Sequence, residues 1–270
     1  MPHTSGPSAP IGVYDSGVGG LSVLRALKIT LPDENFVYVA DSANAPYGDR
    51  PESFVVRRAE QIAAFLLGHR AKAIVIACNT ASVAAAARLR ATLSVPVIAM
   101  EPAIKPAVVR SRTRVVLVLA TSGTIRSASV ARLCQLHGAD TRIILQACPG
   151  LVELVEQGQV RGSAIRHLLE KYMRPGLSAG ADTVVLGCTH YAFLAQAVAE
   201  VAGPSVDVLE PSNAIARQLF RVVGNSKHQP VDQASETMFY TSGSSEKLRA
   251  FLAITGERST RIHDLPESAA

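Results

Sequence analysis

The sequence contains no tryptophan, and aromatic residues make up only 5% of its 270 residues. No apolar stretch approaches the ~18 residues that a membrane-spanning helix needs. The first residues, MPHTSGPSAP, have neither a basic start nor an apolar core, so they do not resemble a signal peptide. With 48% hydrophobic and 18% charged residues, the chain is typical of a globular protein. We therefore expect a cytoplasmic protein with a disordered N-terminal arm over residues 1–10.

Cysteine is also scarce, and the sequence has no CxxC pair among Cys78, Cys134, Cys148 and Cys188. Without a secretion signal, this pattern predicts neither disulfides nor a zinc cluster, so we expect no metal site. The net charge of +5 comes from scattered Arg and Lys, so we expect no nucleic-acid partner. The glycine turn at residues 17–20 reads GVGG rather than GxGxxG, and no lysine lies in a setting that suggests a pyridoxal Schiff base. We therefore expect no cofactor.

The stretch AIVIACNTAS at residues 73–82 joins a continuous apolar run to an alanine-rich helical pattern. Such a run predicts a strand buried on both faces, and Asn79 and Thr80 are residue types that begin helices. Cys78 then lies at the carboxyl end of a parallel strand, where ligands bind in open α/β sheets. The helix N-terminus would favour its thiolate form. The alternative is a buried structural cysteine.

A second stretch of the same kind, TVVLGCTHYAFL at residues 183–194, places Cys188 in the corresponding position. The pair admits three interpretations. As metal ligands, the two cysteines lack nearby partners. As a nucleophile with His190, one cysteine would suffice, whereas a facing acid and base would use both thiols.

The predicted elements run βαβαβα twice, which predicts two doubly wound, largely parallel-sheet α/β domains. We expect the domains to be related by pseudo-two-fold symmetry, with the active site in the cleft between them. The first domain would comprise residues 11–101 and 212–256, the second would comprise residues 102–211, and residues 257–270 would form a loose tail.

Six motifs in order resemble the glutamate racemases of the cofactor-independent aspartate/glutamate racemase superfamily. They are GVYDSGVGGLSVL at 12–24, DSANAPYG at 41–48, ACNTAS at 77–82, EPAIKPA at 101–107, LATSGTIRS at 119–127 and GCTHY at 187–191. The resemblance covers the chain from Ile11 to about Leu252. It implies interconversion of L- and D-glutamate without a cofactor, which supplies D-glutamate for peptidoglycan synthesis.

The resemblance also assigns roles to individual residues. Cys78 would deprotonate D-glutamate, assisted by Asp15, and Cys188 would deprotonate L-glutamate, assisted by His190 and Glu156. Glu153 lies three positions before Glu156 on the same helical face, and spacing alone does not choose between them. Substrate contacts would come from residues near both thiols, namely Asp15, Ser16, Tyr47, Gly48, Asn79, Thr80, Thr121, Thr189 and His190.

Other functions remain open at this point. Aspartate racemase is a near relative, a cysteine-dependent hydrolase would need only one thiol, and a binding protein would need neither. The resemblance further implies a homodimer of unspecified arrangement, and family analogy alone suggests a contact with DNA gyrase.

Overall fold

The computed structural model describes residues 9–224, 235–257, 261–266 and 269. The chain divides into two compact units, one of residues 1–100 and 212–270 and one of residues 101–211. The sequence placed the first boundary one residue later, after Glu101. Most of the predicted N-terminal arm, residues 1–8, lies outside the described residues.

The first unit is built on a parallel sheet with the strand order β10-β9-β2-β1-β3-β4. Every residue of β1, β2 and β3 is buried, which explains why these strands have continuous apolar sequences. The strands are β1 (Ile11–Asp15), β2 (Phe36–Ala40), β3 (Ala73–Ile76), β4 (Val97–Ala99), β9 (Thr237–Thr241) and β10 (Ile262–Asp264).

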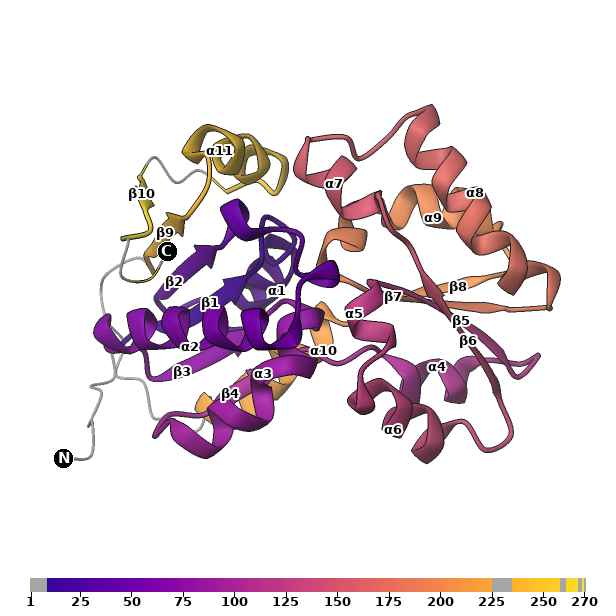
Figure 1. The fold of residues 1–270 in the computed structure, drawn as a ribbon, viewed down its shortest axis with the longest axis horizontal. Helices are drawn as coiled ribbons and strands as arrows, with labels where there is room; N and C mark the ends of the chain where they lie inside the picture. The colour runs from indigo at the N-terminus through magenta and orange to yellow at the C-terminus, as the bar shows by residue number, and fades with distance from the viewer. Residues whose placement is uncertain (1–8, 225–234, 258–260, 267–268, 270) are drawn as a thin grey trace. The chain divides into compact units, whose positions relative to one another are not determined.

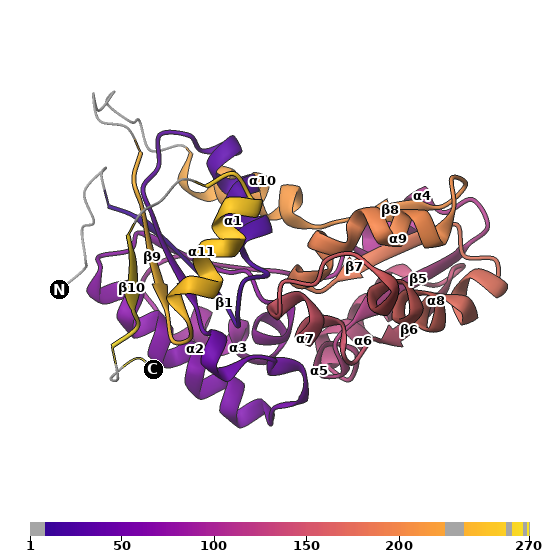
Figure 2. The ribbon, with the colours of Figure 1, turned by 90° about the horizontal axis from the view of Figure 1, so that it is seen from above.

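Helices cover both faces of this sheet. Helices α2 and α3 lie on one face, and α1, α10 and α11 lie on the other (Figures 1 and 2). The helices are α1 (Leu21–Thr30), α2 (Glu52–Gly68), α3 (Asn79–Thr92), α10 (Ser212–Val223) and α11 (Ser245–Ile254), and two 3₁₀ segments, η1 (Ser42–Asn44) and η2 (Tyr47–Asp49), follow β2.

The second unit contains a four-stranded parallel sheet with the order β6-β5-β7-β8. Helices α4 and α6 pack together on one side of it, and α8 and α9 pack together on the other (Figure 1). The strands are β5 (Val115–Ala120), β6 (Arg142–Ala147), β7 (Thr183–Gly187) and β8 (Asp207–Leu209). The helices are α4 (Ile104–Arg110), α5 (Ser122–Ile125), α6 (Ala128–His137), α7 (Leu151–Glu156), α8 (Ser163–Ser178) and α9 (Ala195–Ala202), with η3 (Thr189–Leu194) after β7.

The two units share one strand order. The first four strands of the chain are arranged as β2-β1-β3-β4, and the strands of the second unit are arranged as β6-β5-β7-β8. Each set begins with a central strand, adds a neighbour on one side and then adds two strands on the other. Two parallel-sheet α/β domains are therefore present, and Cys78 and Cys188 follow equivalent strands, β3 and β7.

The C-terminal prediction needs correction. The sequence predicted a loose tail from residue 257, but the structure places β10 there, paired in parallel with β9. Leu265 and Ala269 are buried beside this strand. The three-residue strand was missed because Ile262–Asp264 contains a single apolar residue and shows no alternation.

Two negative findings hold for the described part of the chain. None of its helices is both long and apolar enough to cross a membrane. Among the same residues, no group of three or more His, Cys, Asp or Glu side chains is placed to hold a metal ion.

Candidate active site

Cys78 forms the N-cap of α3, two residues after β3 ends. Its Sγ accepts the backbone N–H of Ala81 at 3.5 Å, and only 5% of the residue is exposed. The thiol therefore lies where unpaired helix N–H groups and the positive end of the helix dipole stabilise a thiolate.

The turn after β1 brings a hydroxyl and a carboxylate to the same region. Ser16 Oγ lies 3.4 Å from Cys78 Sγ, because β1 and β3 are adjacent strands. Asp15 is fully buried, and its carboxylate accepts the N–H of Gly17 at 2.9 Å. A Cβ on Gly20 would lie 2.6 Å from Asp15 Cβ, so the close approach of α1 to Asp15 requires glycine there.

Asn79 and Thr80 begin α3 beside the thiol, and both are buried. Neither the oxygen nor the nitrogen of the Asn79 amide has a hydrogen-bond partner within the described residues. An amide buried in this way costs about 1–3 kcal/mol, and a ligand that pairs with it would remove that cost. Asn79 is therefore well suited to bind a polar ligand next to Cys78.

Tyr47 and Gly48 lie in η2 and are also buried. The Tyr47 hydroxyl donates to Asp41 Oδ2 at 2.5 Å, and burial together with the Asp41 charge raises the pKa of this phenol. Its proton is thus committed to another side chain of the first unit.

In the second unit, Cys188 precedes η3 and is 7% exposed. Its Sγ lies 3.9 Å from Nδ1 of His190, and Nε2 of His190 lies 2.6 Å from Oε1 of Glu156. Glu156 is the last residue of α7. These two contacts connect a thiol, an imidazole and a carboxylate in series. This contact involves Glu156 rather than Glu153, the distinction that sequence spacing could not make.

Competing effects set the protonation of His190. Burial would lower its pKa, but the hydrogen bonds to Cys188 and Glu156 and the charges of these groups raise the pKa well above its ordinary value. The raised pKa favours the doubly protonated ring, which can donate both to the sulfur and to the carboxylate.

The two threonines predicted from the resemblance lie at strand ends in this unit. Thr121 follows β5, forms the N-cap of α5 and accepts the N–H of Thr124 at 3.3 Å. Thr189 follows Cys188 directly and is 4% exposed. Because the carboxyl ends of parallel strands meet at one edge of a sheet, both hydroxyls belong to the edge that carries Cys188.

Cys148 is a further buried thiol in the second unit. Its Sγ donates to the carbonyl oxygen of Gln146 at 3.4 Å. Burial, with a smaller contribution from the charge of Cys188, raises its pKa, so it stays protonated. A protonated thiol that already donates to a carbonyl is poorly suited to act as a base.

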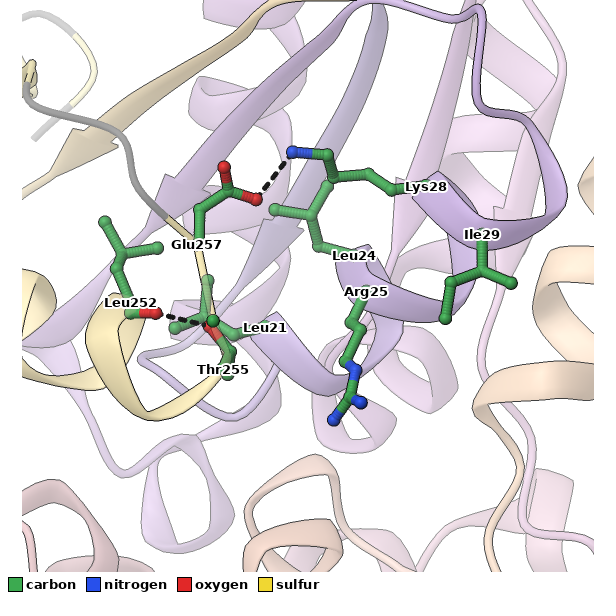
Figure 3. A pocket seen from close by; sticks show the side chains of 9 residues that line it. Leu21, Leu24, Arg25, Lys28, Ile29, Leu252, Thr255 and Glu257 are labelled. Carbon is green, nitrogen blue, oxygen red and sulfur yellow. Dashed lines mark hydrogen bonds and ion pairs between the residues drawn. The ribbon is translucent and has the colours of Figure 1, made fainter.

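A hollow of about 310 Å³ lies elsewhere on the first unit, between α1 and the end of α11 (Figure 3). It is lined by Leu21, Leu24, Arg25, Lys28, Ile29, Leu252, Thr255, Gly256 and Glu257. An ion pair between Lys28 and Glu257 spans it at 2.5 Å. None of the predicted site residues lines this hollow.

Two buried charged residues of the first unit were missed from the sequence. Asp41 and Arg58 are both buried and form a bidentate ion pair, with 2.8 Å for each of the two hydrogen bonds. Asp41 stands inside the DSANAPYG motif, which was the available signal. Arg58 lies in a helical run beside Arg57, and nothing in the local pattern sets it apart.

Comparison with known proteins points in one direction. Residues 19–219 match the family model described as Asp/Glu/Hydantoin racemase. A glutamate racemase from Methylococcus capsulatus is 47% identical over 267 residues, which cover 98% of each chain. Solved structures of glutamate racemases are similar to this chain over nearly its whole length.

The glutamate racemase from Thermus thermophilus, solved in complex with β-chloro-D-alanine, has a TM-score of 0.83 and is 36% identical to this chain. The match covers 98% of this chain and 99% of that chain. The Francisella tularensis structure, in complex with D-glutamate, has a TM-score of 0.84 at 27% identity, with 97% of this chain and 98% of that chain covered.

Proposed function

The chain belongs to the Asp/Glu/Hydantoin racemase family and is an isomerase that racemises glutamate, and we propose that Cys78 and Cys188 carry out the two proton transfers. The observation that best supports the thiol assignment is that each of two domains with the same strand order carries a buried cysteine after its equivalent strand. Racemisation reverses one stereocentre, so a base on one face of the α-carbon and an acid on the other are sufficient.

The steps conserve protons. Starting from L-glutamate, the Cys188 thiolate takes the α-proton, and the thiol of Cys78 delivers a proton to the opposite face. Cys188 ends as a thiol and Cys78 as a thiolate, which is the state that starts the reaction from D-glutamate. The mechanism requires both thiols to act on one bound substrate molecule.

Each thiolate has its own source of stabilisation. Protonated His190, held by Glu156, supplies a positive charge beside Cys188. The start of α3 and the hydroxyl of Ser16 stabilise Cys78. Asp15, buried at the end of β1, would assist proton transfer at Cys78.

The remaining predicted residues would bind the substrate. The buried Asn79 amide is the strongest candidate, because the described residues leave it without a partner. Hydroxyl and backbone N–H groups suit two carboxylates, since they supply hydrogen bonds without adding negative charge. These groups belong to Ser16, Tyr47, Gly48, Thr80, Thr121, Thr189 and His190.

The test follows the α-hydrogen of L- and D-glutamate by NMR in deuterated buffer. The native protein should interconvert the enantiomers with deuterium incorporation, and Cys78→Ser and Cys188→Ser should each lower net racemisation by at least about 10³-fold. Cys134→Ser is the matched control, because Cys134 is a half-buried thiol on α6 outside the proposed site. It should retain native activity.

Two other outcomes would redirect the assignment. If one cysteine variant stayed near native, a single-nucleophile reaction such as amide hydrolysis would replace the two-thiol mechanism. Aspartate, one methylene shorter, is the alternative substrate. A higher kcat/KM for aspartate than for glutamate would move the chain to that activity.

We infer further that the D-glutamate product feeds peptidoglycan synthesis and that the protein acts as a homodimer in the cytoplasm. The family membership supports the first inference, and the expectation of a dimer rests on the family resemblance alone. Sedimentation velocity across a concentration series would test the dimer, and a single monomer boundary throughout would reject it.

A further inference from the structure

The Asp41 carboxylate collects five hydrogen bonds just beyond the end of β2. Oδ1 accepts from Asn44 Nδ2 at 3.0 Å, from Ser242 Oγ at 2.8 Å and from Arg58 Nη2 at 2.8 Å. Oδ2 accepts from the Tyr47 hydroxyl at 2.5 Å and from Arg58 Nε at 2.8 Å. The donors come from the 42–49 loop itself, from α2 and from the segment after β9.

This set of bonds uses the whole carboxylate. A carboxylate has about four lone-pair sites, so five donors leave no capacity for a substrate group. Four of the five N–H groups of Arg58 are used as well, because besides its two bonds to Asp41, Nη1 donates to Gln61 and Nη2 donates to the carbonyl oxygen of Ala269, each at 2.8 Å. Asp41 directly follows β2, at the edge of the sheet where ligands bind in open α/β folds, and its contacts hold the surrounding protein segments together.

The Asp41–Arg58 ion pair also determines the net charge of this buried region. Burial would raise the pKa of Asp41, but the hydrogen bonds from Arg58, Tyr47 and Asn44 and the charge of Arg58 lower it, so the carboxylate stays ionised. An uncompensated buried carboxylate here would repel both a dicarboxylate substrate and a thiolate at Cys78. The guanidinium of Arg58 cancels that charge.

The contacts of the Tyr47 side chain leave its hydroxyl no proton to donate to a substrate. It donates its only proton to Asp41, while its ring packs edge-on against Phe54 at 6.3 Å between centroids. The side chain is thus held by α2 on one side and by the carboxylate on the other. Any hydrogen bond that Tyr47 gives to a substrate would have to come from its backbone.

We propose that Asp41 and Arg58 are positioning residues that hold the 42–49 loop, and with it Tyr47 and Gly48, in the conformation that binds substrate. The Tyr47 hydroxyl acts through Asp41 rather than on the substrate. This inference rests on the proposed function, since it assigns a role in glutamate binding.

A double-mutant cycle tests the inference with glutamate as substrate. Asp41→Asn, which removes the charge and replaces one of the two acceptor oxygens with a donor, should raise KM about tenfold while kcat stays within about threefold. Tyr47→Phe should raise KM about fivefold. If the hydroxyl acts through Asp41, the double variant should match Asp41→Asn within about twofold. KM increases that multiply would mean that Tyr47 contacts substrate directly, and would overturn the inference.

Asp182→Asn is the matched control in the second unit. Asp182 is also a buried carboxylate, held by the Ser111 hydroxyl at 2.6 Å and by the N–H groups of Arg112 and Thr113 at 2.7 and 3.0 Å. Ser111, Arg112 and Thr113 lie between α4 and β5, and none of them is a predicted substrate contact. This variant should lower the melting temperature without changing KM, so a KM shift shared by both variants would count against a specific role for Asp41.

Ser242→Ala provides a milder variant in case Asp41→Asn does not fold. Ser242 Oγ bridges the loop to the carboxylate, because it also accepts the N–H of Ala43 at 3.1 Å. KM should rise about threefold with kcat retained. An unchanged KM would overturn the inference even if native protein racemises glutamate, whereas absence of racemisation in the native protein would instead reject the proposed function.

Discussion

The surroundings of Cys78 and Cys188 differ, although the two thiols follow equivalent strands. Cys78 caps a helix of 14 residues, accepts an N–H from it and lies beside the Ser16 hydroxyl. Cys188 precedes a six-residue 3₁₀ segment, and among the described residues its sulfur accepts no N–H from that segment. Its partner is the imidazole of His190.

Under the two-thiol proposal, this difference means that one topological position holds a reactive thiol in two ways. Backbone N–H groups and a hydroxyl surround the thiol of the first unit, whereas an imidazole that contacts a carboxylate lies beside the thiol of the second. A short 3₁₀ segment offers a weaker dipole than a long α-helix, so an added charge on that side is physically reasonable. The predictions below change one side at a time.

Among changes to the surroundings of the thiols, the largest effect is expected from His190→Asn, which removes the imidazole beside Cys188 but keeps a polar side chain. We expect kcat to fall about 100-fold, because a positioned acid or base contributes about 10²–10⁴-fold. The enantiomers have equal free energies, so kcat/KM must fall equally in both directions. Slower proton transfer at Cys188 alone should therefore be detected in the α-deuterium isotope effect. This isotope effect should increase more for L-glutamate, which Cys188 would deprotonate, than for D-glutamate. Equal isotope effects would contradict separate roles for the two thiols.

Glu156→Gln should change stability in a pH-dependent way. The pKa of His190 is raised in the folded protein, so the stabilisation from this pair is complete below about pH 6.5 and is lost as pH rises through the raised pKa. We expect the variant to be less stable than the native protein by about 2 kcal/mol near pH 6, with a smaller difference at alkaline pH. Urea unfolding across this range measures the difference. Parallel curves would mean that Glu156 does not set the protonation of His190.

Sequence patterns predicted most of the architecture because buried parallel strands have a strong signature. The apolar runs that end before Cys78 and Cys188 correspond to β3 and β7, in which every residue is buried. The presence of two similar units also followed from the sequence, because each of these apolar runs is followed by a cysteine and then by a residue that can begin a helix. Strand β10 left no such signature, and only its pairing with β9 defines it.

The candidate site was less predictable where long-range contacts decide it. Glu153 and Glu156 lie three positions apart on one helical face, so their spacing does not tell which of them contacts His190. In the structure, Glu156 makes that contact. The sequence analysis made Tyr47 a substrate contact, which stays a prediction. The direction of its hydroxyl depends on Asp41, and sequence patterns do not predict such a contact between two side chains.

The smallest effect is expected from Ser16→Ala on the Cys78 side. Ser16 Oγ lies 3.4 Å from the sulfur, while the N–H of Ala81 and the helix dipole remain after the substitution. Loss of one hydrogen bond, worth about 0.5–1.5 kcal/mol, should lower kcat by about threefold to tenfold. Measuring kcat for L- and D-glutamate in both variants, Ser16→Ala and His190→Asn, tests whether the Cys78 thiolate depends on several weak contacts rather than on one dominant partner. A 100-fold loss would show instead that Ser16 is as decisive for Cys78 as His190 is for Cys188.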